Sequence, residues 1–135
     1  MKLWNGYGSE HSANLVLIGE FEGVDKAEKA LQLLNEVAEV AQADEADGLL
    51  EAGKVSTRFS DRVLDLLTRA NLSLDYGDTE ELLYEFGARR EGEKVIITTE
   101  ELSLNAFMKV LLHGGAKIEV YSRHDHPGPY GRPTS

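Results

Sequence analysis

The fold is decided by the stretch Gly8-Ser9-Glu10-His11-Ser12-Ala13-Asn14-Leu15-Val16-Leu17-Ile18-Gly19-Glu20-Phe21. This stretch begins polar and then becomes continuously apolar over residues 15–18. A short, unbroken apolar run predicts a strand at about residues 13–21 that is buried on both faces, in the middle of a sheet. We expect the rest of the chain to pack around this strand.

Length and composition indicate one soluble globular domain. A chain of 135 residues can bury its own core, and hydrophobic and charged fractions of 41% and 28% are ordinary for such a domain. No apolar run reaches the roughly 18 residues of a membrane helix, and residues 1–6 lack the apolar region of a signal peptide. Without cysteine the chain has no disulfide and no thiolate nucleophile. We expect a cytoplasmic protein.

The net charge disfavours nucleic acid and membrane partners. It is formally -10, whereas binding to phosphates depends on Lys and Arg. The acidic excess is concentrated in residues 20–51, which hold ten acidic residues against Lys26 and Lys29. Two interpretations stay open for this segment: a solvated helix face that keeps the protein soluble, or a docking face for a basic partner.

Apolar residues at helical spacing predict three helices. The first runs from about residue 24 to residue 43, and the second begins after Ser60 as N-cap and ends near Asn71. The third is capped by Thr99 or Ser103 and ends at His113, before a glycine pair that suits a helix C-terminus. His113 is expected to interact with the dipole of that helix.

Three further strands follow from β-type patterns. Residues 82–87 and 94–99 predict a hairpin joined by the polar loop 88–93. Residues 116–121 alternate between apolar and charged side chains and predict an edge strand. Residues 123–135 hold all three prolines and predict an extended tail.

The resulting order is strand, helix, helical insertion, hairpin, helix, strand. Apart from the insertion, at about residues 44–80, this is the α+β split β-α-β pattern called ferredoxin-like, in a single domain over residues 1–122. We expect a four-stranded antiparallel or mixed sheet in which the first strand lies beside the third, parallel to it. The fourth strand is expected antiparallel to the first at an edge. Two helices cover one face, and the insertion or a second copy covers the other.

The opening also carries a family resemblance. The residues Trp4-Asn5-Gly6-Tyr7-Gly8-Ser9-Glu10-His11-Ser12, followed by Asn14-Leu15-Val16, resemble the start of a small bacterial family of unknown function. The resemblance covers mainly the first twenty residues. It implies a compact α/β domain and supplies no activity and no catalytic residue.

Topology is expected to bring four polar residues to one corner of the sheet. If the last strand lies antiparallel to the first, Glu10 and His11 converge with His124 and His126. Imidazoles and a carboxylate together can bind a divalent metal or act as a proton-transfer pair. His11, Glu10 and His124 are therefore the candidate catalytic residues, and His11, His124 and His126 are the candidate metal ligands. The alternative is that the two later histidines belong to a solvated tail.

Partner-binding candidates are fewer. Arg89 and Arg90 form a compact basic spot suited to an anion or an acidic partner, although charged hairpins also serve solubility. Trp4 and Tyr7 are expected to pack against the core edge or a partner subunit, because each buries a large area.

Three functional hypotheses follow. We expect a non-catalytic interaction or ligand-binding domain, a homodimer, without a cofactor. The first alternative is a small hydrolase or lyase that uses the histidine corner. The second is an acidic inhibitor or immunity-type protein with one exposed acidic face, made of Glu36, Glu39, Asp44 and Glu45, whose binding weakens with salt.

Overall fold

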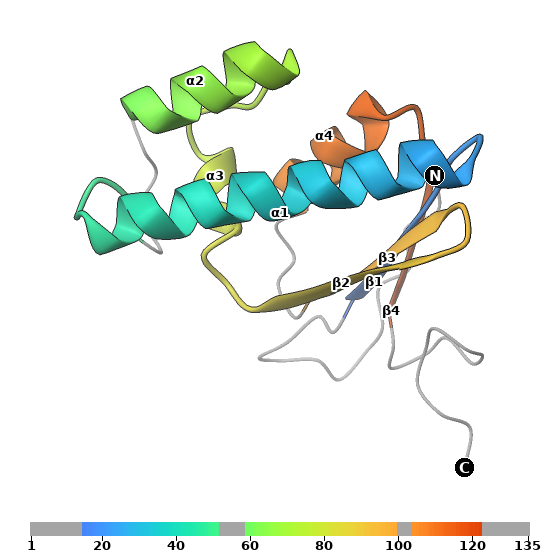
Figure 1. The fold of residues 1–135 in the computed structure, drawn as a ribbon. Coiled ribbons are helices and arrows are strands. Elements are labelled where there is room, and N and C mark those ends of the chain that lie inside the picture. Colours follow the sequence, from blue (N-terminus) through green and yellow to red (C-terminus); the bar gives the residue numbers. More distant parts are fainter. Residues whose placement is uncertain (1–14, 52–58, 100–103, 123–135) are drawn as a thin grey trace.

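The computed structural model describes residues 15–51, 59–99 and 104–122 (Figure 1). In chain order their elements are β1 (Leu15–Glu20), α1 (Val24–Ala46), α2 (Asp61–Ala70), α3 (Asp78–Glu81), β2 (Phe86–Glu91), β3 (Lys94–Thr99), α4 (Asn105–His113) and β4 (Lys117–Ser122). They form an α+β domain with helices packed against one sheet. No helix in these ranges is long and apolar enough to cross a bilayer.

The sheet has four strands in the order β2-β3-β1-β4, and every neighbouring pair is antiparallel. The predicted neighbours of β1 are confirmed: β3 lies on one side of it and β4 on the other. The parallel pairing expected between the first and third strands is wrong, because Leu15 lies opposite Thr99 and Glu20 opposite Lys94. The reason is the hairpin, which reverses the chain between β2 and β3, so that β3 runs against β1.

β1 is buried on both faces, as predicted. Leu15 and Leu17 belong to the main core beneath the helices. Val16 and Ile18 project to the opposite face, where they pack with Ile96, and none of these three is more than 9% exposed. The continuous apolar run in the sequence therefore reflects a strand with two packed sides.

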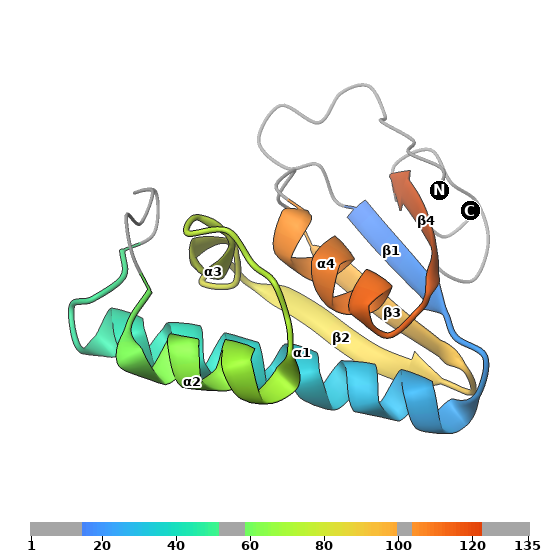
Figure 2. The ribbon, with the colours of Figure 1, turned by 90° about the horizontal axis from the view of Figure 1, so that it is seen from above.

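The four helices of the described residues, α1 to α4, lie on one side of the sheet (Figures 1 and 2). Helices α1 and α4 contact the strands, and α2 lies on α1, on the side away from the sheet. The expectation that the insertion covers the second face of the sheet is therefore wrong for α2. Polar contacts at the N-terminus of α2 hold this helix against α1. Ser60 Oγ accepts a hydrogen bond from the Val63 amide at 3.2 Å, and so caps α2 as predicted. The same hydroxyl donates a hydrogen bond to Asp44 of α1 at 2.7 Å. The predicted stop at Asn71 is also confirmed, with Asn71 in the left-handed region.

The hairpin is tighter than the sequence indicated. Its strands continue to Glu91 and resume at Lys94, so the turn is only Gly92-Glu93 and not residues 88–93. Gly92 has φ +61° and Glu93 is not in the positive-φ region, as in a type II′ turn. At the other end, β2 begins at Phe86 rather than at residue 82. Four residues before that point, Asp78–Glu81, form the short helix α3.

Candidate functional site

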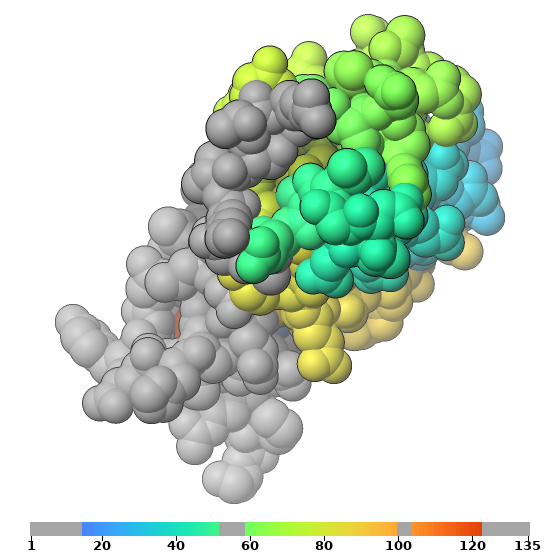
Figure 3. Space-filling view, turned by 90° about the vertical axis from the view of Figure 1, so that its left-hand side faces the viewer, coloured from blue at the N-terminus to red at the C-terminus, as the bar shows by residue number. Residues whose placement is uncertain are grey.

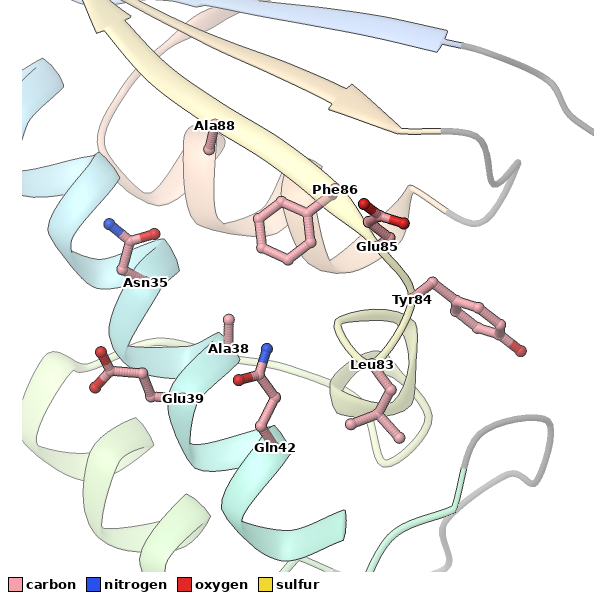
Figure 4. Close-up of a pocket in the computed structure, with 9 residues that line it drawn as sticks. All are labelled: Asn35, Ala38, Glu39, Gln42, Leu83, Tyr84, Glu85, Phe86 and Ala88. Atoms are coloured by element: carbon pink, nitrogen blue, oxygen red, sulfur yellow. The ribbon is translucent and has the colours of Figure 1, made fainter. Parts of the chain in front are cut away.

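The candidate site is a cleft between α1 and the edge strand β2, with a volume of about 490 Å³ (Figure 4). One wall comes from α1 and the other from β2 and the segment that leads into it. Its lining residues are Asn35, Ala38, Glu39, Gln42, Leu83, Tyr84, Glu85, Phe86 and Ala88. Figure 3 views the end of the molecule at which α1 finishes, where the last turns of α1 lie between α2 and the segment leading into β2.

The floor of the cleft is apolar and its rim is polar. The Phe86 ring and the Ala88 methyl group turn from β2 toward α1, and Ala38 turns from α1 toward them (Figure 4). The amides of Asn35 and Gln42 stand seven residues apart, and so on one face of α1 above this floor. The lining as a whole is more polar than apolar, and its apolar part is the Phe86 ring with Ala38, Leu83 and Ala88.

β2 has a free backbone edge in the part of the chain that the structure describes, because β3 is its only strand neighbour there. A two-residue turn makes Glu91 and Lys94 a hydrogen-bonded pair, and hydrogen-bonded pairs alternate along an antiparallel ladder. The backbone amides and carbonyls of Phe86, Ala88 and Arg90 therefore point away from β3. These groups are available to an incoming strand.

Charge is distributed unevenly along this edge. Arg89 pairs with Glu91 at 2.7 Å, and Arg90 donates to the Gly92 carbonyl at 3.0 Å. Charged side chains are a common protection of edge strands against unwanted pairing. Phe86 and Ala88, which lie beside the cleft, carry no such protection.

The two arginines proposed as a basic spot therefore lie within β2, not in a loop. As strand neighbours they project to opposite faces of the sheet. Their role in binding a partner remains a prediction.

Two carboxylates mark the rim of the cleft as anionic. Glu39 on α1 and Glu85 before β2 are both exposed, and neither has a cationic partner among the residues described. Of the four carboxylates expected on an exposed acidic face of α1, Glu36, Glu39 and Glu45 are exposed and only Asp44 is buried. Asp44 is only 4% exposed and is held by Ser60 and Arg62, and Glu36 lies 3.6 Å from Arg69.

The β2 wall is supported by contacts that reach from α3 to α4. Phe86 makes an edge-to-face contact with Phe107 of α4, with ring centroids 4.9 Å apart. Glu81 Oε1 accepts a hydrogen bond from the Ala106 amide at 2.9 Å, and so caps α4, whose own N-cap is Leu104. The predicted cap Thr99 lies in β3 instead, and Ser103 lies outside the described residues.

Two titrating groups lie in this support. Burial raises the pKa of the Glu81 carboxyl above its ordinary value, although the hydrogen bond from Ala106 opposes the shift. Lys109 contacts Asp78 at 2.6 Å and Asp75 at 3.1 Å, and the hydrogen bond to Asp78 raises the pKa of its ammonium group. α3 is thus fixed to α4 by a backbone cap and an ion pair.

The histidine corner lies at the limit of the described chain. The pairing of β1 with β4 places Leu15 opposite Ser122, so β1 begins beside the end of β4. Glu10, His11, His124 and His126 lie outside the described residues, as do Trp4 and Tyr7. Within the described ranges, no group of three metal-ligating side chains is placed to hold an ion.

Sequence reasoning missed the cleft, although part of its signal was present. The seven-residue spacing of Asn35 and Gln42 placed two amides on one helix face, and Phe86 and Ala88 alternate along a strand. What the sequence lacked was the pairing of that helix face with that strand edge.

Comparison with known proteins identifies a family and no activity. A family model described as a family of unknown function (DUF6375) matches residues 1–130, rather than only the first twenty residues. No curated protein matches the chain, and no solved structure does. The chain belongs to the family of unknown function DUF6375.

Proposed function

We propose that this protein is a non-catalytic interaction domain that binds an extended segment of a partner protein in the cleft between α1 and β2. The observation that carries this proposal is the uncharged edge of β2 at Phe86 and Ala88, which lies beside the cleft and has no strand partner among the described residues. An extended segment would pair its backbone with β2, and α1 would contact its side chains. We further propose a ferredoxin-like topology, which the order and antiparallel pairing of the strands support.

The side chains that line the cleft indicate which kind of segment would bind there. Alternate side chains of an added strand would point toward the apolar floor formed by Ala38 and Phe86. Glu39 and Glu85 at the rim, together with the net charge of -10, favour a segment that carries lysine or arginine. The partner is therefore a basic, β-prone segment, and its binding weakens as salt screens the carboxylates.

A pair of end-blocked heptapeptides tests this proposal. One alternates valine with lysine, and the other alternates valine with glutamate. We expect the full chain to bind the lysine peptide at least about tenfold more tightly by isothermal titration calorimetry. Glu39→Lys should weaken that binding about tenfold, whereas Glu28→Lys, which makes the same charge change three turns away on α1, should have little effect. Equal binding of both peptides would contradict the proposal.

The backbone part of the proposal has its own test. Ala88→Pro removes an amide that points away from β3, a position where edge strands tolerate proline. We expect this variant to keep its circular dichroism spectrum and to lose at least about tenfold in affinity for the lysine peptide. If the variant does not fold, a lysine peptide with alternate N-methylated amides should show the same loss with the natural chain. Undiminished binding of the N-methylated peptide would overturn strand addition.

The homodimer expected from the sequence is a separate proposal. Sedimentation of the natural chain and of Ala88→Pro distinguishes two arrangements. A dimer that persists in the variant places the self-association surface away from β2. A dimer that the variant disrupts would mean that a second copy occupies the edge, and would replace the partner segment proposed here.

A second candidate function is a hydrolase or lyase at the histidine corner. The pairing of Leu15 with Ser122 supports it, because β1 begins beside the end of β4. In the sequence, Glu10 and His11 come shortly before Leu15, and His124 and His126 come shortly after Ser122. Zinc titration followed by histidine ring NMR tests it. Simultaneous shifts of His11 and His124 that a His11→Ala change abolishes are expected, and independent, unsaturable shifts would contradict the candidate.

A further inference from the structure

A second cleft, of about 460 Å³, lies between the first half of α1 and the end of α4. It is separate from the cleft beside β2. Its lining residues are Lys26, Lys29, Ala30, Leu33, Val110, His113, Gly114 and Gly115.

The position of α2 leaves this cleft uncovered. α2 lies over the C-terminal half of α1 and ends before the half that faces α4 (Figure 2). The floor is formed by Ala30, Leu33 and Val110, and Leu33 is only partly buried. At the end of the cleft Gly114 packs directly against the Phe21 ring, because a Cβ atom at this position would lie only 2.7 Å from that ring. The cleft is therefore a groove with an apolar floor beside closely packed side chains.

The charge of this groove is opposite to that of the protein. Its ionisable lining groups are Lys26, Lys29 and His113, whereas the clefts beside β2 and beside Ser60 are lined by carboxylates. Lys26 pairs with Glu22 at 3.2 Å. Lys29 has no acidic partner among the described residues. Lys29 is therefore an exposed cation without such a partner beside an apolar floor, and it attracts an anion with an apolar body even though the net charge of the chain, -10, opposes anion binding.

We infer that this groove binds a small amphipathic carboxylate, such as a medium-chain aliphatic acid. The chain lies along Ala30, Leu33 and Val110, and the carboxylate meets the ammonium group of Lys29 at the mouth. The apolar contact supplies most of the affinity and the ion pair supplies the selectivity for an anion. The inference does not depend on the function proposed for the β2 cleft.

Titrations with octanoate, octylammonium and acetate distinguish the contribution of the apolar chain from that of the charged headgroup. In ¹H–¹⁵N NMR titrations of the natural chain we expect octanoate to cause saturable shifts at Lys29, Val110 and Gly115. Octylammonium, with the same chain and the opposite charge, should bind at least about tenfold more weakly, and acetate should cause no saturable shift. The headgroup and the chain are then both required.

Two variants locate the site. Lys29→Glu should weaken octanoate at least about tenfold and strengthen octylammonium, whereas Lys117→Glu, the same charge change on β4, should alter neither. Leu33→Ala should weaken both ligands. Equal shifts with octanoate and octylammonium in the natural chain, saturable shifts confined to other residues, or no effect of Lys29→Glu would each overturn the inference.

Discussion

Phe107→Ala is expected to lower the free energy of unfolding by about 3–5 kcal/mol. Phe107 of α4 is the largest of the fully buried side chains, at 1% exposure, and it belongs to the main hydrophobic core. Its removal leaves a cavity and also removes the edge-to-face contact with Phe86. Urea unfolding followed by far-UV circular dichroism measures the change.

The same substitution should also affect the cleft. Phe86 loses the ring against which it is held, so the affinity for the lysine heptapeptide should fall even under conditions where the variant is folded. Phe107→Leu is the matched control, because it keeps an apolar side chain and should cost about half as much or less. A loss below about 1 kcal/mol for Phe107→Ala would contradict the packing described for α4.

Glu81→Ala is expected to cost about 1–3 kcal/mol of stability, because it leaves the Ala106 amide and the N-terminus of α4 without their acceptor. Glu81→Gln keeps an oxygen acceptor at the same place and removes the charge. Because burial raises the pKa of the natural carboxyl, its ionisation in the folded state is unfavourable. We therefore expect Glu81→Gln to be at least as stable as the natural chain at pH 7.

The stability difference between Glu81→Gln and the natural chain should change with pH in a defined direction. A carboxyl whose folded pKa lies above its unfolded value of about 4.5 contributes most to stability at low pH. That contribution falls as the pH rises from the unfolded value through the folded one. The stability of Glu81→Gln relative to the natural chain should thus increase over this interval and be constant below it. A difference that stays flat, or that moves in favour of the natural chain, would contradict the buried cap.

The sequence predicted the parts of the fold that depend on local patterns. The apolar run at residues 15–18, the Ser60 cap and the alternation before Ser122 each identified an element, because burial and capping act through neighbours in the chain. The β2–β3 turn was misplaced, because Arg89, Arg90 and Glu91 resemble a polar loop but occupy a strand at the sheet edge. Edge strands favour such charges, so composition alone does not separate them from loops.

The cleft required information that no local pattern carries. Asp44 was expected on an exposed acidic face, yet it is buried and held by Ser60. Glu81 caps a helix through the amide of Ala106, 25 residues further along the chain. Burial of a carboxylate depends on which donor the tertiary structure provides. In the same way, Gln42 and Phe86 line one site only because the fold places α1 beside β2 (Figure 4).

Amide hydrogen exchange, read by NMR with and without the lysine heptapeptide, tests strand addition most directly. If the peptide adds to β2, exchange should slow at Phe86 and Ala88, whose amides point away from β3, while Gly87 and Arg89 change little because β3 already bonds them. If the peptide binds without protecting Phe86 and Ala88, or protects the outward amides of β4 instead, the β2 edge is not the docking site and the proposed function is wrong.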